Sequence, residues 1–204
     1  MKTVILFLRH EEHGVDGSIK QELPPSARER ARARGKALKG LVPQIDAAYS
    51  SPQVRAYCTV VETLIGHGAL MPIRTDDRLG DVAMDGVDPA PIKAKAKEMG
   101  IEVEELCFQP SQVSLEFEQL MLKRALQGAN ALWQIAATHD GQVVLVGSHG
   151  GSRMEVSILG LKNPEAKTFA DLGTATQIID RGQIVRLVVD ATTGELVEEE
   201  YLDL

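Results

Sequence analysis

The segment Val4-Ile5-Leu6-Phe7-Leu8-Arg9-His10 gives the strongest indication of how this chain folds. Five consecutive apolar residues predict a short strand that is buried on both faces of a sheet. The run is much shorter than the roughly 20 apolar residues that cross a membrane, and it lacks the cleavage site of a signal peptide. Because it ends directly in an arginine and a histidine, this strand brings two polar side chains to one edge of the sheet.

Two further predicted strands also end in polar residues. Val143–Gly147 is followed by Ser148-His149-Gly150-Gly151, and a shorter strand over 45–49 is followed by Ser50-Ser51-Pro52. Arg55 comes one helical turn after Pro52. Ligands of parallel sheets bind beyond the carboxyl ends of the strands, so we expect these side chains to converge on one pocket.

The rest of the chain alternates between helical and strand patterns. We predict helices over 26–41, 53–65, 92–100, 113–137 and 150–159, and strands over 72–74, 174–180 and 184–190. Arg181-Gly182 is predicted to form a hairpin turn between the last two strands, and residues 195–204 a final strand or a solvated tail. This alternation predicts an α/β fold, a three-layer α/β/α sandwich with a mostly parallel sheet. We expect one domain over 1–204, with a helical insertion at about 82–137.

Composition excludes several classes of partner. The chain has 204 residues, of which 44% are hydrophobic and 25% charged, as in ordinary globular domains. Its net charge of -7 disfavours nucleic acid and anionic membrane, so neither is expected as a partner. The two cysteines, Cys58 and Cys107, are too few for a disulfide framework. We expect free thiols and a cytoplasmic location.

The residue types at the three strand ends suit a phosphate group. Guanidinium groups match phosphate oxygens bidentately, and a neutral imidazole can attack phosphorus to form a phosphohistidine. A second imidazole, protonated by its neighbours, would donate to the same oxygens. Gly150, at a predicted helix start, would let backbone N–H groups approach the anion. A carboxylic acid is still needed to protonate the leaving alcohol.

Four motifs resemble those of the histidine phosphatase superfamily, also called phosphoglycerate mutase-like. They are Leu8-Arg9-His10-Glu11, Ser50-Ser51-Pro52-Gln53-Val54-Arg55, Arg78-Leu79-Gly80-Asp81 and Gly147-Ser148-His149-Gly150-Gly151. The resemblance spans about residues 3–160, with the motifs in the family's order and spacing. It is nearest to the small phosphohistidine phosphatases.

The resemblance implies a phosphoglycerate mutase-like fold and a phosphatase that needs no cofactor. His10 would be the nucleophile, and Arg9, Arg55 and His149 would complete the phosphate pocket. Asp81 would be the proton donor, with Asp85 as the alternative. The substrate would be a small phosphorylated metabolite or a phosphohistidine protein.

Glu11 departs from the family pattern, which has glycine after the histidine. A carboxylate beside the pocket would repel a phosphate dianion. This favours a second hypothesis, a catalytically weakened phosphate-binding or regulatory protein on the same fold. A third hypothesis is a phosphoglycerate-type mutase, but the tryptophan-asparagine pair of the mutases is replaced by His13-Gly14-Val15-Asp16.

The remaining motifs are interpreted as structural features rather than as functional sites. The histidines of His10-Glu11-Glu12-His13 lie three residues apart rather than four, so no metal site is expected. No glycine-rich nucleotide motif is present in the sequence. His67 and His139 precede turns and are expected to be exposed, and the arginines of the 26–41 helix are expected on a solvated face. The sequence identifies neither the exact substrate nor the oligomeric state.

Overall fold

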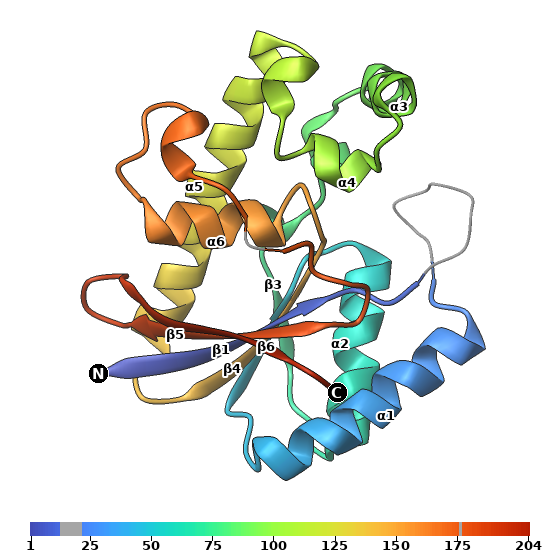
Figure 1. Ribbon diagram of the computed structural model, residues 1–204. Helices are drawn as coiled ribbons and strands as arrows, with labels where there is room; N and C mark the ends of the chain where they lie inside the picture. Colours follow the sequence, from blue (N-terminus) through green and yellow to red (C-terminus); the bar gives the residue numbers. More distant parts are fainter. Residues whose placement is uncertain (13–21, 176) are drawn as a thin grey trace.

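Six strands and six α-helices make up the described part of the chain, which comprises residues 1–12, 22–175 and 177–204 of a computed structural model (Figure 1). In chain order the elements are β1 Lys2–Arg9, α1 Pro25–Leu41, β2 Ala47–Ser50, α2 Val54–His67, β3 Ile73–Thr75, α3 Pro89–Met99, α4 Val103–Leu106, α5 Leu115–Thr138, β4 Val143–Ser148, α6 Met154–Lys162, β5 Ile184–Asp190 and β6 Leu196–Leu202. Four short 3₁₀ helices lie between them, η1 Asp77–Leu79, η2 Val82–Asp85, η3 Pro110–Gln112 and η4 Ala170–Leu172.

The strands form one sheet in the order β3-β2-β4-β1-β5-β6. The pairings among β3, β2, β4 and β1 are parallel, whereas β1–β5 and β5–β6 are antiparallel. The carboxyl ends of β1 and β4 lie in register, with Arg9 opposite Ser148, and Ser50 of β2 lies opposite Gly147. The predicted mostly parallel α/β sheet is confirmed.

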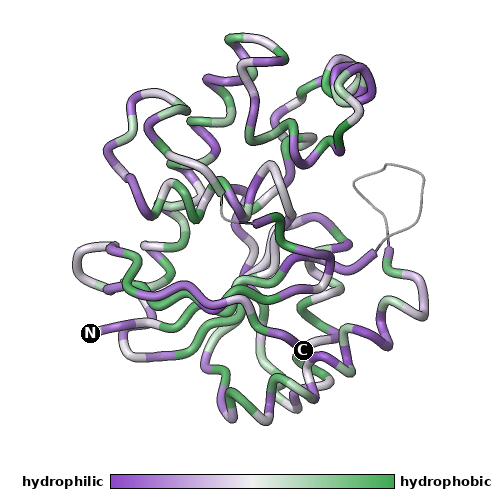
Figure 2. Tube along the Cα trace, viewed as in Figure 1, coloured by the Kyte–Doolittle hydropathy of each residue, from purple (hydrophilic) through white to green (hydrophobic). Residues whose placement is uncertain are grey.

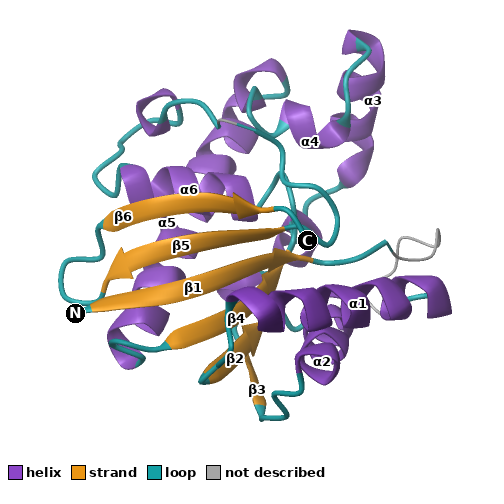
Figure 3. Ribbon diagram, turned by 60° about the horizontal axis from the view of Figure 1, so that its bottom comes forward, coloured by secondary structure: helices purple, strands orange, loops and turns teal. Residues whose placement is uncertain are grey.

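Helices cover both faces of this sheet (Figures 1 and 3). One face packs Ile5 and Phe7 against α5 and α6, and the other packs Leu6 and Leu8 against α1 and α2. Because side chains alternate along a strand, the unbroken apolar run of β1 supplies both cores. Figure 2 shows apolar residues concentrated along the central strands.

A third apolar cluster lies beyond the sheet and joins α3, α4, α5 and α6. Its buried members include Ile92, Leu106, Phe117, Met121 and Val156. The cluster packs α3 and α4 against α5 and α6. The ion pair between Glu104 of α4 and Arg9 places α4 beside the carboxyl end of β1. These two helices therefore form one wall of the region where the predicted site residues meet.

The C-terminal part of the chain corrects one prediction. Residues 174–180, apart from the undescribed 176, form no strand, and the predicted hairpin at Arg181-Gly182 is wrong. The backbone of Ile179 is used elsewhere, because its N–H donates to Glu155 Oε1 and its carbonyl accepts from Arg9 Nη1. Strand β5 pairs antiparallel with β1 on one side and with β6 on the other. Residues 196–202 therefore form a final strand rather than a tail.

Two smaller predictions are also wrong. Helix α6 begins at Met154 rather than at Gly150, because Gly151 adopts φ +58° and residues 150–153 form turns. His67 is buried, with Nε2 2.7 Å from the carbonyl of Val42, rather than exposed. The segment His13-Gly14-Val15-Asp16, which was compared with the tryptophan-asparagine pair of the mutases, lies outside the described residues.

Within the described ranges, none of the helices has both the length and the apolar character needed to cross a bilayer.

Candidate active site

Three strand ends bring the predicted site together at one edge of the sheet. The N–H of His10 donates to the carbonyl of Ser148 at 3.0 Å, and the N–H of Ser51 donates to the carbonyl of Gly147 at 2.9 Å. These bonds continue the parallel ladders one residue past the strands. His10, Ser51 and His149 are therefore held side by side by the backbone itself.

A pocket of about 330 Å³ opens at this edge. All six residues predicted as catalytic or phosphate-binding line it: Arg9, His10, Arg55, Asp81, His149 and Gly150. Such a volume lies at the small end of the range of about 300–1,000 Å³ that is typical of small-molecule sites. The structure thus brings together residues that are up to 141 positions apart in sequence, from Arg9 to Gly150.

His10 is oriented by the backbone of the residue that follows it. Its Nδ1 lies 2.6 Å from the carbonyl oxygen of Glu11. A carbonyl only accepts hydrogen bonds, so Nδ1 carries the proton and Nε2 keeps its lone pair. Arg55 Nε lies 3.3 Å from this Nε2 and donates to it. The nitrogen with nucleophilic capacity therefore faces the arginine that was predicted to bind phosphate.

His149 lies beside His10, with 5.0 Å between ring centroids and 59° between ring planes. Its Nε2 is 2.9 Å from Ser51 Oγ, and its Nδ1 has no hydrogen-bond partner among the described residues. Burial lowers the pKa of His149 well below its usual value, and the positive charges of Arg55, Arg124 and Arg153 lower it further. The sequence led us to expect a protonated ring, but these surroundings favour the neutral one.

Asp81 lies at the rim of the pocket and is held by several partners. Its Oδ2 pairs with Arg55 Nη2 at 2.7 Å, and its Oδ1 accepts from Ser152 Oγ at 2.9 Å. Burial lowers the pKa of Arg55, and the charge of Asp81 partly offsets this effect. Asp85, the alternative acid, pairs instead with Arg124 and does not line the pocket. The geometry therefore favours Asp81 over Asp85 as the carboxyl group next to His10.

Arg9 and Gly150 fit against each other. Arg9 Nη2 pairs with Glu104 Oε1 at 2.9 Å, and Nη1 donates to the carbonyl of Ile179. A methyl group at Gly150 would overlap the guanidinium of Arg9. Gly150 was expected to let backbone N–H groups approach an anion at a helix start. The structure shows a different reason for glycine, because its missing side chain makes room for Arg9.

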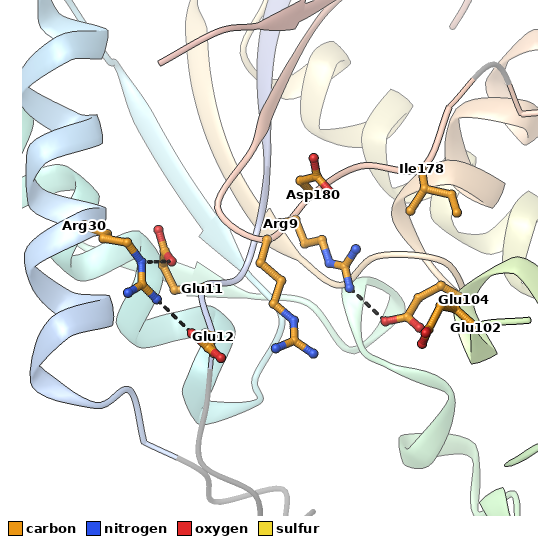
Figure 4. A pocket seen from close by; sticks show the side chains of 9 residues that line it. Arg9, Glu11, Glu12, Arg30, Glu102, Glu104, Ile178 and Asp180 are labelled. Atoms are coloured by element: carbon orange, nitrogen blue, oxygen red, sulfur yellow. Dashed lines mark hydrogen bonds and ion pairs between the residues drawn. The ribbon is translucent and has the colours of Figure 1, made fainter.

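Glu11 points away from the main pocket and toward α1. Its carboxylate pairs with Arg34. It also pairs with Arg30 Nε at 3.2 Å (Figure 4). Glu11 and Arg30 line an adjoining cavity of about 510 Å³, which Figure 4 shows together with the Arg9–Glu104 pair. The arginines of α1 are therefore not merely a solvated face, and the predicted repulsion between Glu11 and a phosphate loses its geometric basis.

Several residues at the site were missed by sequence reasoning. Gln53 Oε1 accepts from the N–H of Asp81 at 2.7 Å, and Lys93, Ser152 and Arg181 also line the pocket. Ser152 and Gln53 stand next to recognised motifs, so position alone could have suggested them. Arg181 was hidden by the incorrect hairpin prediction.

Two buried arginines hold the backbone next to Asp81. Arg124 Nη2 and Arg153 Nε both donate to the carbonyl of Gly80, at 2.6 and 2.9 Å. Burial lowers the pKa of Arg124 to about 9 and that of Arg153 to about 10. Arg124 lies on the apolar face of α5 that carries Met121 and Ala125, and a charge inside such a stripe is a signal of a buried polar role.

Comparisons with known proteins agree with this geometry. No curated protein matches the chain. Among solved structures, mycobacterial glucosyl-3-phosphoglycerate phosphatase has a TM-score of 0.66 at 18% identity, covering 98% of this chain and 97% of that one. Phosphoserine phosphatase from Entamoeba histolytica has a TM-score of 0.62 at 18% identity, covering 99% and 98%. Phosphoglycerate mutase from Bacillus anthracis has a TM-score of 0.66 at 18% identity, covering 98% and 92%.

At these identities the three structures establish the fold, which is that of phosphoglycerate mutase-like proteins. The family model of the histidine phosphatase superfamily (branch 1) matches residues 7–190, a range that holds β1 from Phe7 onward, every site residue and β5. The chain therefore belongs to branch 1 of the histidine phosphatase superfamily.

Proposed function

We propose that this protein is a phosphatase that hydrolyses small phosphomonoesters through a phosphohistidine intermediate on His10. The observation that carries the proposal is the convergence of His10 Nε2, Arg55, His149 and Asp81 on one pocket of about 330 Å³. Family membership supports the same chemistry. The similar proteins from Entamoeba histolytica and mycobacteria are named as phosphatases of phosphoserine and of glucosyl-3-phosphoglycerate.

In the first step, His10 Nε2 attacks phosphorus and the bond from phosphorus to the ester oxygen breaks. Asp81 in its protonated form gives its proton to the departing alcohol, leaving a carboxylate. Arg9 and Arg55 hold the phosphoryl oxygens, whose negative charge is redistributed in the transition state. The bound dianion would raise the pKa of His149, so that its ring could donate to the same oxygens.

In the second step, the Asp81 carboxylate takes a proton from a water molecule, whose oxygen attacks the phosphorus of phosphohistidine. The bond from phosphorus to His10 Nε2 breaks, inorganic phosphate leaves, and Asp81 is again protonated. The two steps together consume one ester and one water and need no metal or organic cofactor.

The test is hydrolysis of 4-nitrophenyl phosphate by the purified protein, compared with His10→Ala and with His139→Ala as a matched control. His139 lies outside the pocket and contacts Tyr49 and Gln142. We expect His10→Ala to lose at least about 10³-fold in kcat and His139→Ala to retain full activity. Wild-type turnover no faster than that of His10→Ala would refute the proposal. Rapid quenching with alkali should additionally trap a phosphate bound to His10, because phosphohistidine is labile to acid.

The other hypotheses have less support. A catalytically weakened protein was suggested by repulsion from Glu11, whose carboxylate pairs with arginines of α1 instead. A mutase remains testable by direct assay with 3-phosphoglycerate, and the segment that would distinguish it, residues 13–16, lies outside the described part of the chain. The pocket volume favours a small metabolite over a phosphohistidine protein. The cytoplasmic location stays part of this proposal and rests on the two free cysteines.

A further inference from the structure

The side of the pocket that faces away from the sheet is apolar. Six residues from η2, α3, α4, the C-cap of α4 and α5 line it: Val82, Pro89, Ile92, Val103, Cys107 and Phe117. Ile92, Cys107 and Phe117 belong to the buried cluster that joins these helices, so the wall is held in place by the core behind it. Burial raises the pKa of the Cys107 thiol, which keeps this group neutral.

The same wall offers few partners for hydroxyl groups. Among the described residues, α3, α4 and α5 contribute no hydroxyl or amide side chain to the pocket. Their charged members are Lys93, and Glu104, which already pairs with Arg9. Gln53 and Ser152 come from other segments and are bonded to Asp81 through Gln53 Oε1 and Ser152 Oγ, whereas Gln53 Nε2 has no partner among the described residues. Hydroxyl groups of a leaving alcohol that lies against these apolar side chains would therefore lose most of their hydrogen bonds to water, since the three helices contribute only Lys93 and the paired Glu104 as polar side chains there.

We propose that the preferred substrates are phosphomonoesters of compact apolar alcohols, with an aromatic ring or a branched alkyl group packed against Ile92, Val103 and Phe117. This inference rests on the proposed function, since it places the phosphoryl group at His10 and the alcohol on the far side of Asp81. The volume of about 330 Å³ accommodates one ring beside the phosphate rather than an extended molecule.

The first test compares benzyl phosphate with glycerol 3-phosphate. Both release a primary alcohol, so a difference in kcat/KM reports contacts with the alcohol rather than leaving-group chemistry. We expect kcat/KM to be at least about tenfold higher for benzyl phosphate, because a buried polar group without a partner costs about 10- to 100-fold. Equal values, or a preference for glycerol 3-phosphate, would overturn the inference while leaving the proposed function intact.

Absence of turnover for both esters beyond the His10→Ala level would instead count against the proposed function. In that case, the affinities of the two esters for the wild-type protein are compared by titration calorimetry. Tighter binding of benzyl phosphate by about tenfold or more would still support the apolar alcohol site. Equal or weaker binding would refute it.

The wall itself is tested with Val103→Thr, which preserves shape and adds a hydroxyl group. The matched control is Val113→Thr, since Val113 packs on the same apolar cluster but does not line the pocket. We expect Val103→Thr to raise KM for benzyl phosphate about three- to tenfold and to leave KM for glycerol 3-phosphate unchanged or lower. Val113→Thr should leave both values unchanged. If Val103→Thr and Ile92→Ala both keep the wild-type preference, the alcohol does not contact this wall and the inference fails.

Discussion

The carboxylate of Glu11 is paired with the guanidinium of Arg34, and the backbone of Gly182 covers the pair. A side chain at Gly182 would overlap both groups. The backbone N–H of Gly182 donates to the carbonyls of Arg9 and His10, at 3.1 and 3.3 Å. Glu11 is 2% exposed, and its own N–H donates to Thr59 Oγ1 at 3.0 Å. The residue after the nucleophile is therefore anchored through its side chain to α1 and through its backbone to α2.

Restoring the family's glycine should harm this protein. Glu11→Gly leaves Arg34 without its carboxylate and frees the segment whose carbonyl orients His10, so we expect kcat for 4-nitrophenyl phosphate to fall at least about tenfold. The free energy of unfolding should fall by about 2–4 kcal/mol, because one member of a mostly buried ion pair is removed. Urea unfolding and steady-state kinetics measure the two effects.

The double variant Glu11→Gly with Arg34→Met is the control for this prediction. Removing both charges should recover part of the stability but not the activity, since the anchor remains absent. A rise in activity on Glu11→Gly would contradict the anchoring role and revive repulsion of the phosphate.

Gly150→Ala should disturb Arg9 without unfolding the protein. The added methyl group overlaps the Arg9 guanidinium, which would have to leave the phosphate side of the pocket. We expect kcat/KM to fall about 10- to 100-fold. The matched control is Gly40→Ala in α1, where a methyl group meets nothing within 4 Å and should add up to about 1 kcal/mol of stability. A wild-type kcat/KM in Gly150→Ala would show that catalysis does not depend on the observed position of the Arg9 guanidinium.

Asp81 and Asp85 can be separated by their dependence on the leaving group. Asp81→Asn should lower kcat for an alkyl phosphate by about 10²- to 10⁴-fold, but much less for 4-nitrophenyl phosphate, whose leaving group needs no proton. Asp85→Asn should instead lower stability by about 1–3 kcal/mol, because buried Arg124 loses its carboxylate partner, and keep the kinetics. The opposite pattern in the two variants would identify Asp85 as the acid.

The buried His149 predicts how stability depends on pH. Its pKa is lowered by folding, so below the ordinary value of 6.5 the unfolded chain binds a proton that the folded chain does not. The contribution of His149 to the free energy of unfolding is fully present above about pH 6.5. It is lost, by up to about 1.4 kcal/mol per pH unit, as the pH falls toward the pKa of His149 in the folded protein.

Urea unfolding of the wild type, His149→Gln and His139→Gln at pH 5, 6 and 7 measures this effect. We expect the slope of stability against pH to become shallower in His149→Gln and to be preserved in His139→Gln. Identical slopes in all three proteins would show that His149 takes up a proton equally well in the folded state.

The sequence predicted the sheet where local pattern was strongest. The apolar runs 4–8 and 143–147 became the two central parallel strands, because such runs can only be buried on both faces. In the segment predicted as a strand over 174–180, the backbone N–H and carbonyl of Ile179 bond to the side chains of Glu155 and Arg9, which no local pattern reveals. This is why a strand was predicted there and none formed.

The residue types at the strand ends could be identified from the sequence, and the six predicted site residues do line one pocket. Where each of them points, and which charge its surroundings favour, depends on the packing of the folded chain. Glu11 turns to Arg34 because α1 packs beside β1, Asp81 rather than Asp85 reaches Arg55, and burial next to other cations favours a neutral His149. Side-chain direction and pKa depend on neighbours that are distant in sequence, and these become neighbours only when the chain has folded.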